Sequence, residues 1–296
     1  MLYYLAMISK DESRQNIIDH FHKNVLGKSP DDSELKTNHK GNLGHWLETN
    51  LGGRIDSDGN ADLNGYECKV ESEKTSWGDW GAPYRIFCDK SYKIFDKKNA
   101  YENMWVLVKS LGVLRSHPRK GVYYSMSGEH VPTYINDETN IGLSLIKKNM
   151  DILITYDFSK DQRHNKNEIT PNEFKKDDLL LFKWHGTDIS FNAYKNDVVS
   201  NDLPIDVIFE GSRASVSIEE RIRRKFGIHG MVIGLKDKSK RFYGLKFFTL
   251  NDWMTFFENK DVLYDTGLTT RNKRPYNQWR SKAKFMRTLE EEIYIP

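Results

Sequence analysis

The segment 65–70 constrains the fold more than any other part of the sequence, because its side chains alternate as they do in a half-buried strand. Successive side chains of an extended chain point to opposite faces. Glu67 and Lys69 therefore share one face, whereas Tyr66 and Cys68 lie on the other, apolar face. The pattern predicts a strand that presents an acid and a lysine side by side.

Two further acids lie close to this strand in the sequence. Asp62 precedes it across a Leu-Asn-Gly turn, which returns the Asp62 carboxylate to the same end of the sheet as Glu67. Upstream, residues 41–51 carry apolar side chains at helical spacing, and two glycines then end the predicted helix. Glu48 lies on this helix and is placed to reach the same site.

A pair of carboxylates with an adjacent lysine suits phosphoester chemistry. Asp62 and Glu67 are the oxygen ligands that Mg²⁺ prefers, with the other octahedral positions left to water and a substrate phosphate. Such an ion activates a bound water and polarises the phosphate. Lys69 is predicted to orient or help deprotonate the attacking water, and Glu48 to act as an outer-shell or second-metal carboxylate.

The rest of the chain predicts a mixed α/β fold, with a central mixed β-sheet flanked by helices. The sequence contains no internal repeat and no low-complexity linker. Helices are expected at 11–26, 41–51, 141–148 and 217–226, and a polar turn at 30–33 is expected to lead into a further helix. Strands are expected at 65–70, 84–88, 104–108, 121–126, 152–156, 179–184, 205–210, 231–235 and 242–248.

Composition narrows the class of protein. Hydrophobic residues make up 38% of the 296 residues, which is enough for a sizeable core. The two cysteines, Cys68 and Cys88, are too few for a disulfide framework and lack the spacing of a zinc site, so a reducing compartment is expected. The chain has no leader pattern and no apolar run of membrane-spanning length, which predicts a cytoplasmic protein without a membrane partner.

The stretch from Gly41 to Lys69 resembles the MutH and MvaI/BcnI branch of the PD-(D/E)XK nucleases. In that branch a Gly-x-x-Gly-x-x-Leu-Glu-x-x-Leu-Gly helix precedes an Asp and a Glu-x-Lys strand. The residues that match are Gly41, Gly44, Leu47, Glu48, Leu51, Gly52, Asp62, Glu67 and Lys69.

The resemblance implies a two-lobed nuclease that clamps double-stranded DNA, with Asp62 and Glu67 as Mg²⁺ ligands, Lys69 as a catalytic residue and Glu48 as an auxiliary one. We expect 1–200 to form the catalytic lobe, with its core at 41–160, and 201–296 to form a basic DNA-recognition lobe. Cys68 stands where the family often has Leu. The segment 71–81, with its two tryptophans, is unlike the basic, serine-rich loop expected there.

Basic residues cluster in the C-terminal third. From Arg271 to Thr288 there are seven Lys or Arg residues and no acidic residue. Gly267 and Pro275 favour a loop over 265–280, from which forked side chains would reach base edges or phosphates. The arginines of the 217–226 helix either grip phosphates or cap its dipole. The candidate DNA-binding residues are Arg221, Arg223, Arg224, Arg271, Lys273, Arg274, Gln278 and Arg280.

These features predict a type II restriction-like endonuclease that cuts double-stranded DNA at a specific short sequence with Mg²⁺. Two alternatives stay open, a MutH-like repair nickase and a non-catalytic sequence-specific DNA-binding protein. Either a monomer or a homodimer is compatible with the sequence, and a cognate DNA methyltransferase of the same system is a further candidate partner. His45, His185 and His229 have either structural or functional roles.

Overall fold

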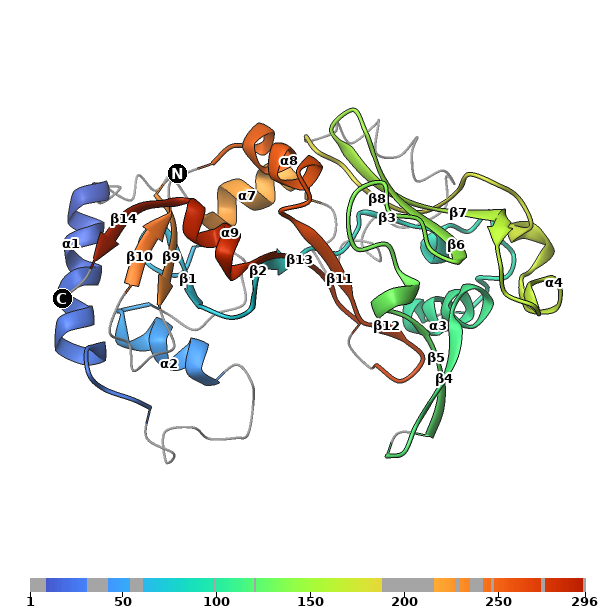
Figure 1. Cartoon of the computed structure of the whole chain (residues 1–296), viewed down its shortest axis with the longest axis horizontal. Coiled ribbons are helices and arrows are strands. Elements are labelled where there is room, and N and C mark those ends of the chain that lie inside the picture. Colours follow the sequence, from blue (N-terminus) through green and yellow to red (C-terminus); the bar gives the residue numbers. More distant parts are fainter. Residues whose placement is uncertain are drawn as a thin grey trace, which may run out of the picture. The chain divides into compact units, whose positions relative to one another are not determined.

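The computed structural model describes residues 9–30, 42–53, 61–97, 99–119, 121–187, 216–226, 229–234, 242–245, 248–272 and 275–294. They form two compact units, each built from distant segments of the chain (Figure 1). The first unit contains Met1–Thr75, Glu220–Trp253 and Ser281–Pro296, and the second contains Ser76–Glu219 and Met254–Arg280. The predicted lobes were 1–200 and 201–296. The observed division differs from them, because strands far apart in sequence pair with one another.

The first unit is organised around a mixed sheet. Its strands lie in the order β1 (Tyr66–Val70), β9 (Gly230–Gly234), β10 (Phe242–Leu245) and β14 (Glu290–Tyr294). β1 runs parallel to β9, and β10 runs antiparallel to both of its neighbours. The strands predicted at 65–70, 231–235 and 242–248 are confirmed within the described residues.

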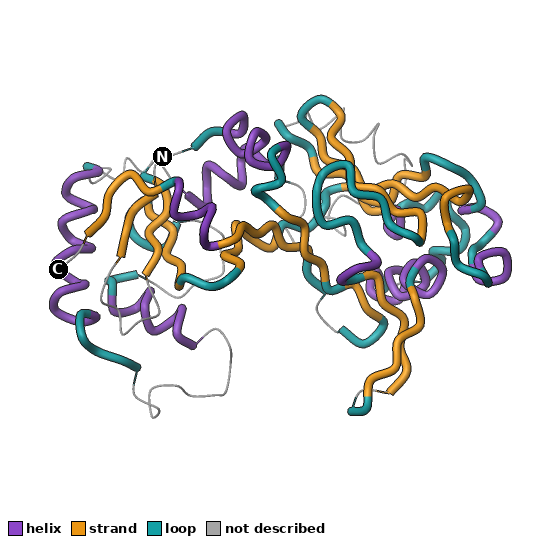
Figure 2. The backbone as a smooth tube through the Cα atoms, in the orientation of Figure 1, coloured by secondary structure: helices purple, strands orange, loops and turns teal. Residues whose placement is uncertain are grey.

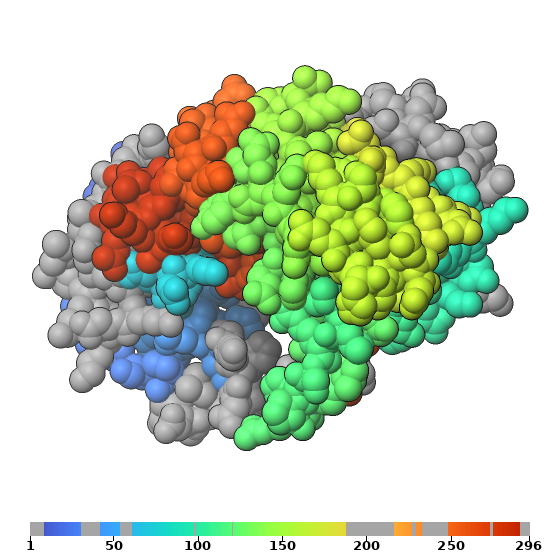
Figure 3. All heavy atoms as spheres, turned by 45° about the vertical axis from the view of Figure 1, so that its right-hand side comes forward, coloured from blue at the N-terminus to red at the C-terminus, as the bar shows by residue number. Residues whose placement is uncertain are grey.

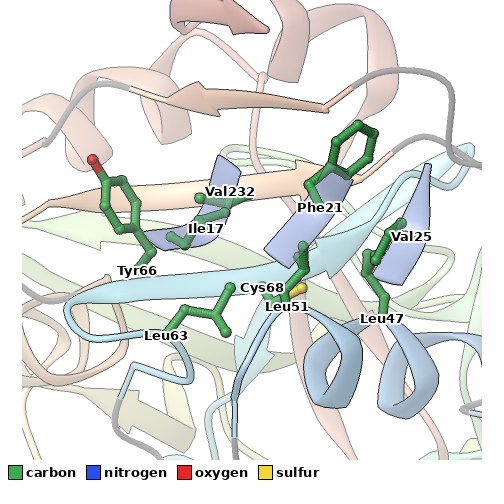
Figure 4. Close-up of a cluster of buried hydrophobic side chains, with 9 residues drawn as sticks. All are labelled: Ile17, Phe21, Val25, Leu47, Leu51, Leu63, Tyr66, Cys68 and Val232. Atoms are coloured by element: carbon green, nitrogen blue, oxygen red, sulfur yellow. The ribbon is translucent and has the colours of Figure 1, made fainter. Parts of the chain in front are cut away.

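Helices from the N-terminal part of the chain cover the apolar face of β1. Helix α1 (Lys10–His20) begins where the Ser9 side chain accepts a hydrogen bond from the Glu12 N–H, and a π-helical turn (Phe21–Val25) continues it. Helix α2 (Asn42–Asn50) lies on the same face (Figure 4). The core between them consists of Ile17, Phe21, Val25, Leu47, Leu51, Leu63, Tyr66, Cys68 and Val232.

The second unit contains most of three further sheets. A tryptophan-rich core lies within it, where Trp184 packs edge-on against Trp279 at 5.3 Å between ring centroids. The strand orders are β3 (Tyr84–Arg85), β8 (Leu179–Trp184), β7 (Asp151–Asp161) and β6 (Ile141–Lys148); β12 (Leu268–Thr269), β5 (Gly121–Met126) and β4 (Val113–His117); and β11 (Leu263–Thr266), β13 (Asn277–Lys282) and β2 (Lys74–Asp79).

Five α-helices and three short 3-10 helices complete the described structure. They are α3 (Ala100–Leu111), α4 (Lys166–Ile169), α7 (Ile218–Phe226), α8 (Leu250–Glu258), α9 (Ala283–Thr288), η2 (Ile86–Cys88), η3 (Gly128–His130) and η4 (Asn172–Phe174). Within the described part of the chain, none of the helices combines the length and the apolar character that crossing a bilayer requires.

Two predicted elements have the wrong type. The predicted strand 104–108 lies inside helix α3, which Asn99 caps by accepting the Tyr101 N–H, and whose residues Met104, Leu107 and Leu111 form one buried face. The predicted helix 141–148 is strand β6, paired along its length with β7. Its residues 141–145 are all buried, and an apolar run buried on both faces carries no periodicity that separates strand from helix.

The structure also corrects two predicted loops. The segment 265–280 contains β12 and parts of β11 and β13, and the segment 71–81 contains β2, whose Trp77 is fully buried. Of the predicted strand 84–88 only the first two residues are extended, and η2 follows them. The predicted strand 205–210 and the helix start expected after 30–33 lie outside the described residues.

Candidate active site

A tight turn sets the position of Asp62 beside strand β1. Asn64 and Gly65 adopt left-handed conformations, with φ of 44° and 98°, and the residues that flank them exchange backbone hydrogen bonds of 2.8 and 3.0 Å. Asp62 precedes this turn, and its Oδ2 accepts the Cys68 backbone N–H at 3.1 Å. The predicted turn is confirmed, and it returns the acid to the strand that carries Glu67.

Glu67 is the centre of the polar cluster on the opposite face of β1. Its side chain is 1% exposed, and its Oε1 accepts a hydrogen bond from the Lys69 Nζ. The Nζ of Lys225, on α7, lies 2.6 Å from the same oxygen. The other oxygen, Oε2, is buried and has no hydrogen-bond partner among the described residues. A carboxylate held by one oxygen and unpartnered at the other is ready to accept a cation.

The C-terminal end of α2 brings Glu48 toward Asp62. The Gly53 N–H donates to the Glu48 carbonyl at 2.8 Å, and a Cβ on Gly53 would lie 2.9 Å from that oxygen and 3.1 Å from the Asp62 carbonyl. Real Cβ atoms essentially never lie within 3.0 Å of another atom, and 3.1 Å is tighter than nine in ten real Cβ contacts. Glycine at this position therefore permits the close contact between the helix end and the turn that carries Asp62.

Burial and neighbouring carboxylates raise the pKa values of two acids in the cluster. Burial, followed by the charges of Glu67 and Glu48, raises the pKa of Asp62 to about 7, although Lys69 and the Cys68 N–H act in the opposite direction. Burial also raises the pKa of Glu48. Burial lowers the pKa of Lys69, but the Glu67 carboxylate outweighs it, so this pKa is raised and the lysine stays charged.

The donor atoms of this cluster suit a hard divalent cation. The described residues contain no group of three or more His, Cys, Asp or Glu side chains arranged to hold a metal. Asp62 and Glu67 offer two carboxylates, and an ion such as Mg²⁺ uses few protein ligands and keeps the rest of its shell for water and phosphate. The unpartnered Oε2 of Glu67 and the raised pKa of Asp62 fit such a cation, which would relieve the repulsion between the two acids.

The burial of Asp62 beside Glu67 predicts a gain in stability when Asp62 loses its charge. The pKa of Asp62 in the folded protein, about 7, lies above the ordinary value of 3.8, so folding becomes less favourable as pH rises between these values. Asp62→Asn avoids this penalty. We expect its melting temperature in chelator to exceed that of the wild type, and by more at about pH 8 than at about pH 5. Scanning fluorimetry measures both, and an equal gain at the two pH values would contradict the account.

The arginines of α7 occupy different environments. Arg221 is buried, at 7% exposure, whereas Arg223 and Arg224 are exposed and pair with Glu220 at 2.5 and 2.6 Å. These two arginines lower the pKa of Glu220 to about 2. A position near the end of the helix suits both an ion pair and a phosphate contact, so the predicted roles of the three arginines in DNA binding stay predictions.

The C-terminal candidates lie on strands or beside them. Gln278 and Arg280 are on β13, where Arg280 donates to the Gln278 side chain and its Nε lies 2.9 Å from an Asp265 carboxylate oxygen. Arg271 is exposed and follows β12. Lys273 and Arg274 lie outside the described residues.

The three histidines have distinct surroundings. His229 is buried against Tyr66, with 5.3 Å between ring centroids, and lies over Gly65 at the turn before β1. His185 is buried in the second unit, with its Nδ1 3.7 Å from an Asp151 carboxylate oxygen. His45 is exposed on α2 and its charge lowers the pKa of Glu48. Packing thus accounts for the positions of the two buried histidines.

Lys225 is the residue at this site that the sequence reading did not select. The spacing of the helix nevertheless contains a usable signal. Ile218, Ile222 and Lys225 are separated by four and three residues, which places all three on one face of a helix. Because the isoleucines are buried, the lysine on their face is directed toward the sheet rather than toward solvent.

A mixed sheet carrying an Asp, a turn and a Glu-x-Lys strand is the arrangement expected of a PD-(D/E)XK nuclease. The family model for the LlaMI restriction endonuclease matches residues 27–293. The chain is 30% identical over 283 residues to the type II restriction enzyme ScrFI of Lactococcus lactis subsp. cremoris, covering 94% of this chain and 97% of that protein. The chain therefore belongs to the LlaMI restriction endonuclease family.

The fold is also similar to that of a solved restriction endonuclease. The match to the restriction endonuclease MvaI in complex with its cognate DNA substrate has a TM-score of 0.52 and 10% sequence identity, and it covers 100% of this chain and 99% of that chain. At this level of identity the likeness concerns the fold. It confirms the restriction-endonuclease-like α/β class predicted from the sequence, and family membership confirms a site-specific endonuclease that acts on DNA.

Proposed function

We propose that this restriction endonuclease is a type II enzyme that hydrolyses both strands of duplex DNA at a short specific sequence, with Mg²⁺ as its cofactor. The observation that carries the proposal is the Glu67 carboxylate, which two lysines hold by Oε1 while Oε2 is buried without a partner. The similarity to ScrFI over nearly the full length of both proteins supports it.

Each residue of the cluster has a role in this reaction. Asp62 and Glu67 would hold the cation, which when bound would polarise the scissile phosphate and make a bound water more acidic. Lys69, whose Nζ donates to Glu67, would orient the attacking water and offset the charge that builds on the phosphate oxygens. Glu48, whose charge raises the pKa of Asp62, is proposed as an auxiliary carboxylate. Hydrolysis then needs no covalent intermediate on the protein.

The exposed arginines supply contacts with the substrate. Arg223, Arg224 and Arg271 are proposed to bind phosphates, and their exposure to solvent supports this. Arg221, Lys273, Arg274, Gln278 and Arg280 are further candidates for phosphate or base contacts. We expect the protein to act in the cytoplasm, where it meets DNA. We expect it to be a monomer or a homodimer. A cognate methyltransferase is expected to protect the host's own sites.

Lys225 is proposed as a positioning residue. Because its Nζ lies 2.6 Å from the Glu67 Oε1, Lys225→Ala removes one of the two contacts that orient the carboxylate. We expect kcat to fall by about 10- to 100-fold, with KM for DNA nearly unchanged and with partial activity retained in Lys225→Arg. The matched control is Lys23→Ala, which removes an exposed lysine of the same unit. A larger change in KM than in kcat for Lys225→Ala would contradict the positioning role.

Digestion of a plasmid of known sequence tests the proposed function directly. Discrete linear fragments with Mg²⁺, and none in chelator, are the expected result, and sequencing of the fragment ends gives the recognition site and the cut position. Relaxed circles without linear product would instead indicate a nickase. Binding without any cleavage under Mg²⁺ would contradict the assignment as an active endonuclease.

A further inference from the structure

Strands β4 and β5 form an antiparallel ribbon that is buried at its root and exposed toward its tip. At the root, Ser125 and Met126 are buried, whereas Leu114 and Val122 are 59% and 61% exposed. With Tyr101, they are the exposed large hydrophobic side chains of the described residues. Figure 2 shows the two strands extending together away from the helix that precedes them, α3. Leu114 lies one residue pair from the root and Val122 one pair from the tip, so aliphatic surface is exposed along the ribbon, where a partner would cover it.

The register of the ribbon separates its side chains into two faces. Leu114 lies opposite Tyr124 and Ser116 opposite Val122, so these side chains share one face. Arg115, opposite Tyr123, lies on the other face. One face of the ribbon is therefore largely apolar, and the other carries a cation and an aromatic ring.

Arg271 adds a second cation to the polar face. Its guanidinium carbon lies 5.8 Å from the centroid of the Tyr123 ring, and a Cβ on Gly121 would lie 3.1 Å from its Nη2. The segment that carries it is tied to the ribbon, because β12 pairs with β5 and the Thr270 N–H donates to the Tyr124 carbonyl at 3.1 Å. The exposed Arg271 is thus part of the ribbon's surface.

The charge of this surface points to a polyanion. Residues 113–126, which are the ribbon and its turn, contain three Lys or Arg and no Asp or Glu, in a chain where acids make up 42 of 296 residues. Arg119, in the turn at the tip, is exposed. In Figure 3 the ribbon, drawn in green, forms a projection at the lower edge of its unit.

We propose that the β4–β5 ribbon enters the major groove of duplex DNA, with Leu114 and Val122 against base edges and with Arg119 and Arg271 on phosphates. The major groove admits a two-stranded ribbon, and thymine methyl groups there offer an apolar surface to aliphatic side chains. The proposal rests on the proposed function, because it names the element with which the endonuclease reads its site. It also adds strands β4 and β5 to the elements proposed to contact DNA, beside the basic segment around Arg271 that the sequence analysis predicted.

The double variant Leu114→Ala/Val122→Ala tests the apolar face. The probes are a duplex that contains the plasmid cut site and one that lacks it, and Ca²⁺ replaces Mg²⁺ as an oxygen-liganded ion. We expect affinity for the first duplex to fall at least about tenfold and affinity for the second to change little. Tyr101→Ala, which removes the exposed side chain on α3, is the matched control and should bind as the wild type does. If Leu114→Ala/Val122→Ala bound the site-containing duplex as tightly as the wild type and Tyr101→Ala do, the proposal would be overturned.

The double variant Arg119→Ala/Arg271→Ala tests the phosphate contacts. It should weaken binding to both duplexes, and the slope of log affinity against log salt should fall by about 2 in magnitude. Lys93→Ala is the control, because it removes the charge of one exposed lysine of the same unit that is not part of the ribbon. An unchanged slope in the double variant would overturn this part of the proposal.

Interference by methylation of guanine N7 identifies the groove. We expect N7 methylation within the site to block binding by the wild type, and to block it less in the variant that lacks both aliphatic side chains.

If the wild type cuts the plasmid while both ribbon variants bind and cut normally, the ribbon proposal fails and the proposed function stands. If nothing is cut but the ribbon variants lose DNA binding, only the proposed function fails. A wild-type dimer that Leu114→Ala/Val122→Ala dissociates, with DNA binding intact, would identify a second copy as the partner and overturn the proposal.

Discussion

Asp62→Asn is expected to abolish DNA cleavage, with a loss on the order of 10³-fold or more in kcat, while the protein stays folded and melts at a higher temperature. The substitution keeps the shape of the side chain and its place beside the Cys68 N–H. It removes the charge with which the side chain would hold a divalent cation. Activity and stability therefore change in opposite directions, which is the signature of a carboxylate kept for chemistry at a cost in folding.

Single-turnover cleavage of the plasmid fragment measures this loss, and binding of the same fragment in Ca²⁺ shows whether the variant still recognises DNA. The matched control is Glu73→Gln, which neutralises an exposed acid a few residues beyond β1 and should cut at the wild-type rate. Cleavage by Asp62→Asn within about tenfold of the wild type would remove Asp62 from the metal site.

Gly53→Ala is expected to lower cleavage by about 10- to 100-fold with only a modest loss of stability. The new Cβ would lie 2.8 Å from a methyl carbon of Leu63 and within about 3 Å of the Glu48 and Asp62 carbonyls. The end of α2 and the turn before β1 must then separate by several tenths of an ångström. A displacement of this order moves Asp62 away from the productive geometry, and small misplacements of reacting groups cost up to about 10² in rate.

Gly44→Ala provides the matched control, since it adds the same methyl group to the first turn of the same helix. No atom lies within 4 Å of a Cβ at Gly44, and alanine is favoured over glycine in helices by about 1 kcal/mol. This variant should be as active as the wild type and slightly more stable, as judged by kcat and by urea unfolding. If Gly53→Ala retained wild-type kcat, the close contact would not position the site.

Local sequence patterns predicted the parts of the site that lie near one another in the chain. Alternation of polar and apolar residues gave the strand that carries Glu67 and Lys69, and a Leu-Asn-Gly sequence gave the turn that positions Asp62. Both depend on interactions within a few residues, so a single sequence contains the necessary information. Helical spacing closed by two glycines likewise placed Glu48 on α2.

The remaining features depend on contacts between distant segments. Lys225 reaches Glu67 because β9, which follows α7, pairs with β1 across more than 150 residues of sequence, and no local pattern specifies such a pairing. The same long-range pairing assembles the first unit from three segments of the chain. Strand β6 was read as a helix because burial on both faces removed its periodicity.

The central claim is that Asp62 and Glu67 hold a divalent cation next to Lys69. A crystal structure of the protein with duplex DNA and Ca²⁺ tests it most directly. We expect Ca²⁺ at about 2.3 to 2.6 Å from an Asp62 carboxylate oxygen and from the Glu67 Oε2, with a phosphate oxygen in the same coordination shell. A cation bound to DNA without either carboxylate, while the Glu67 Oε2 stays without a partner, would contradict the claim.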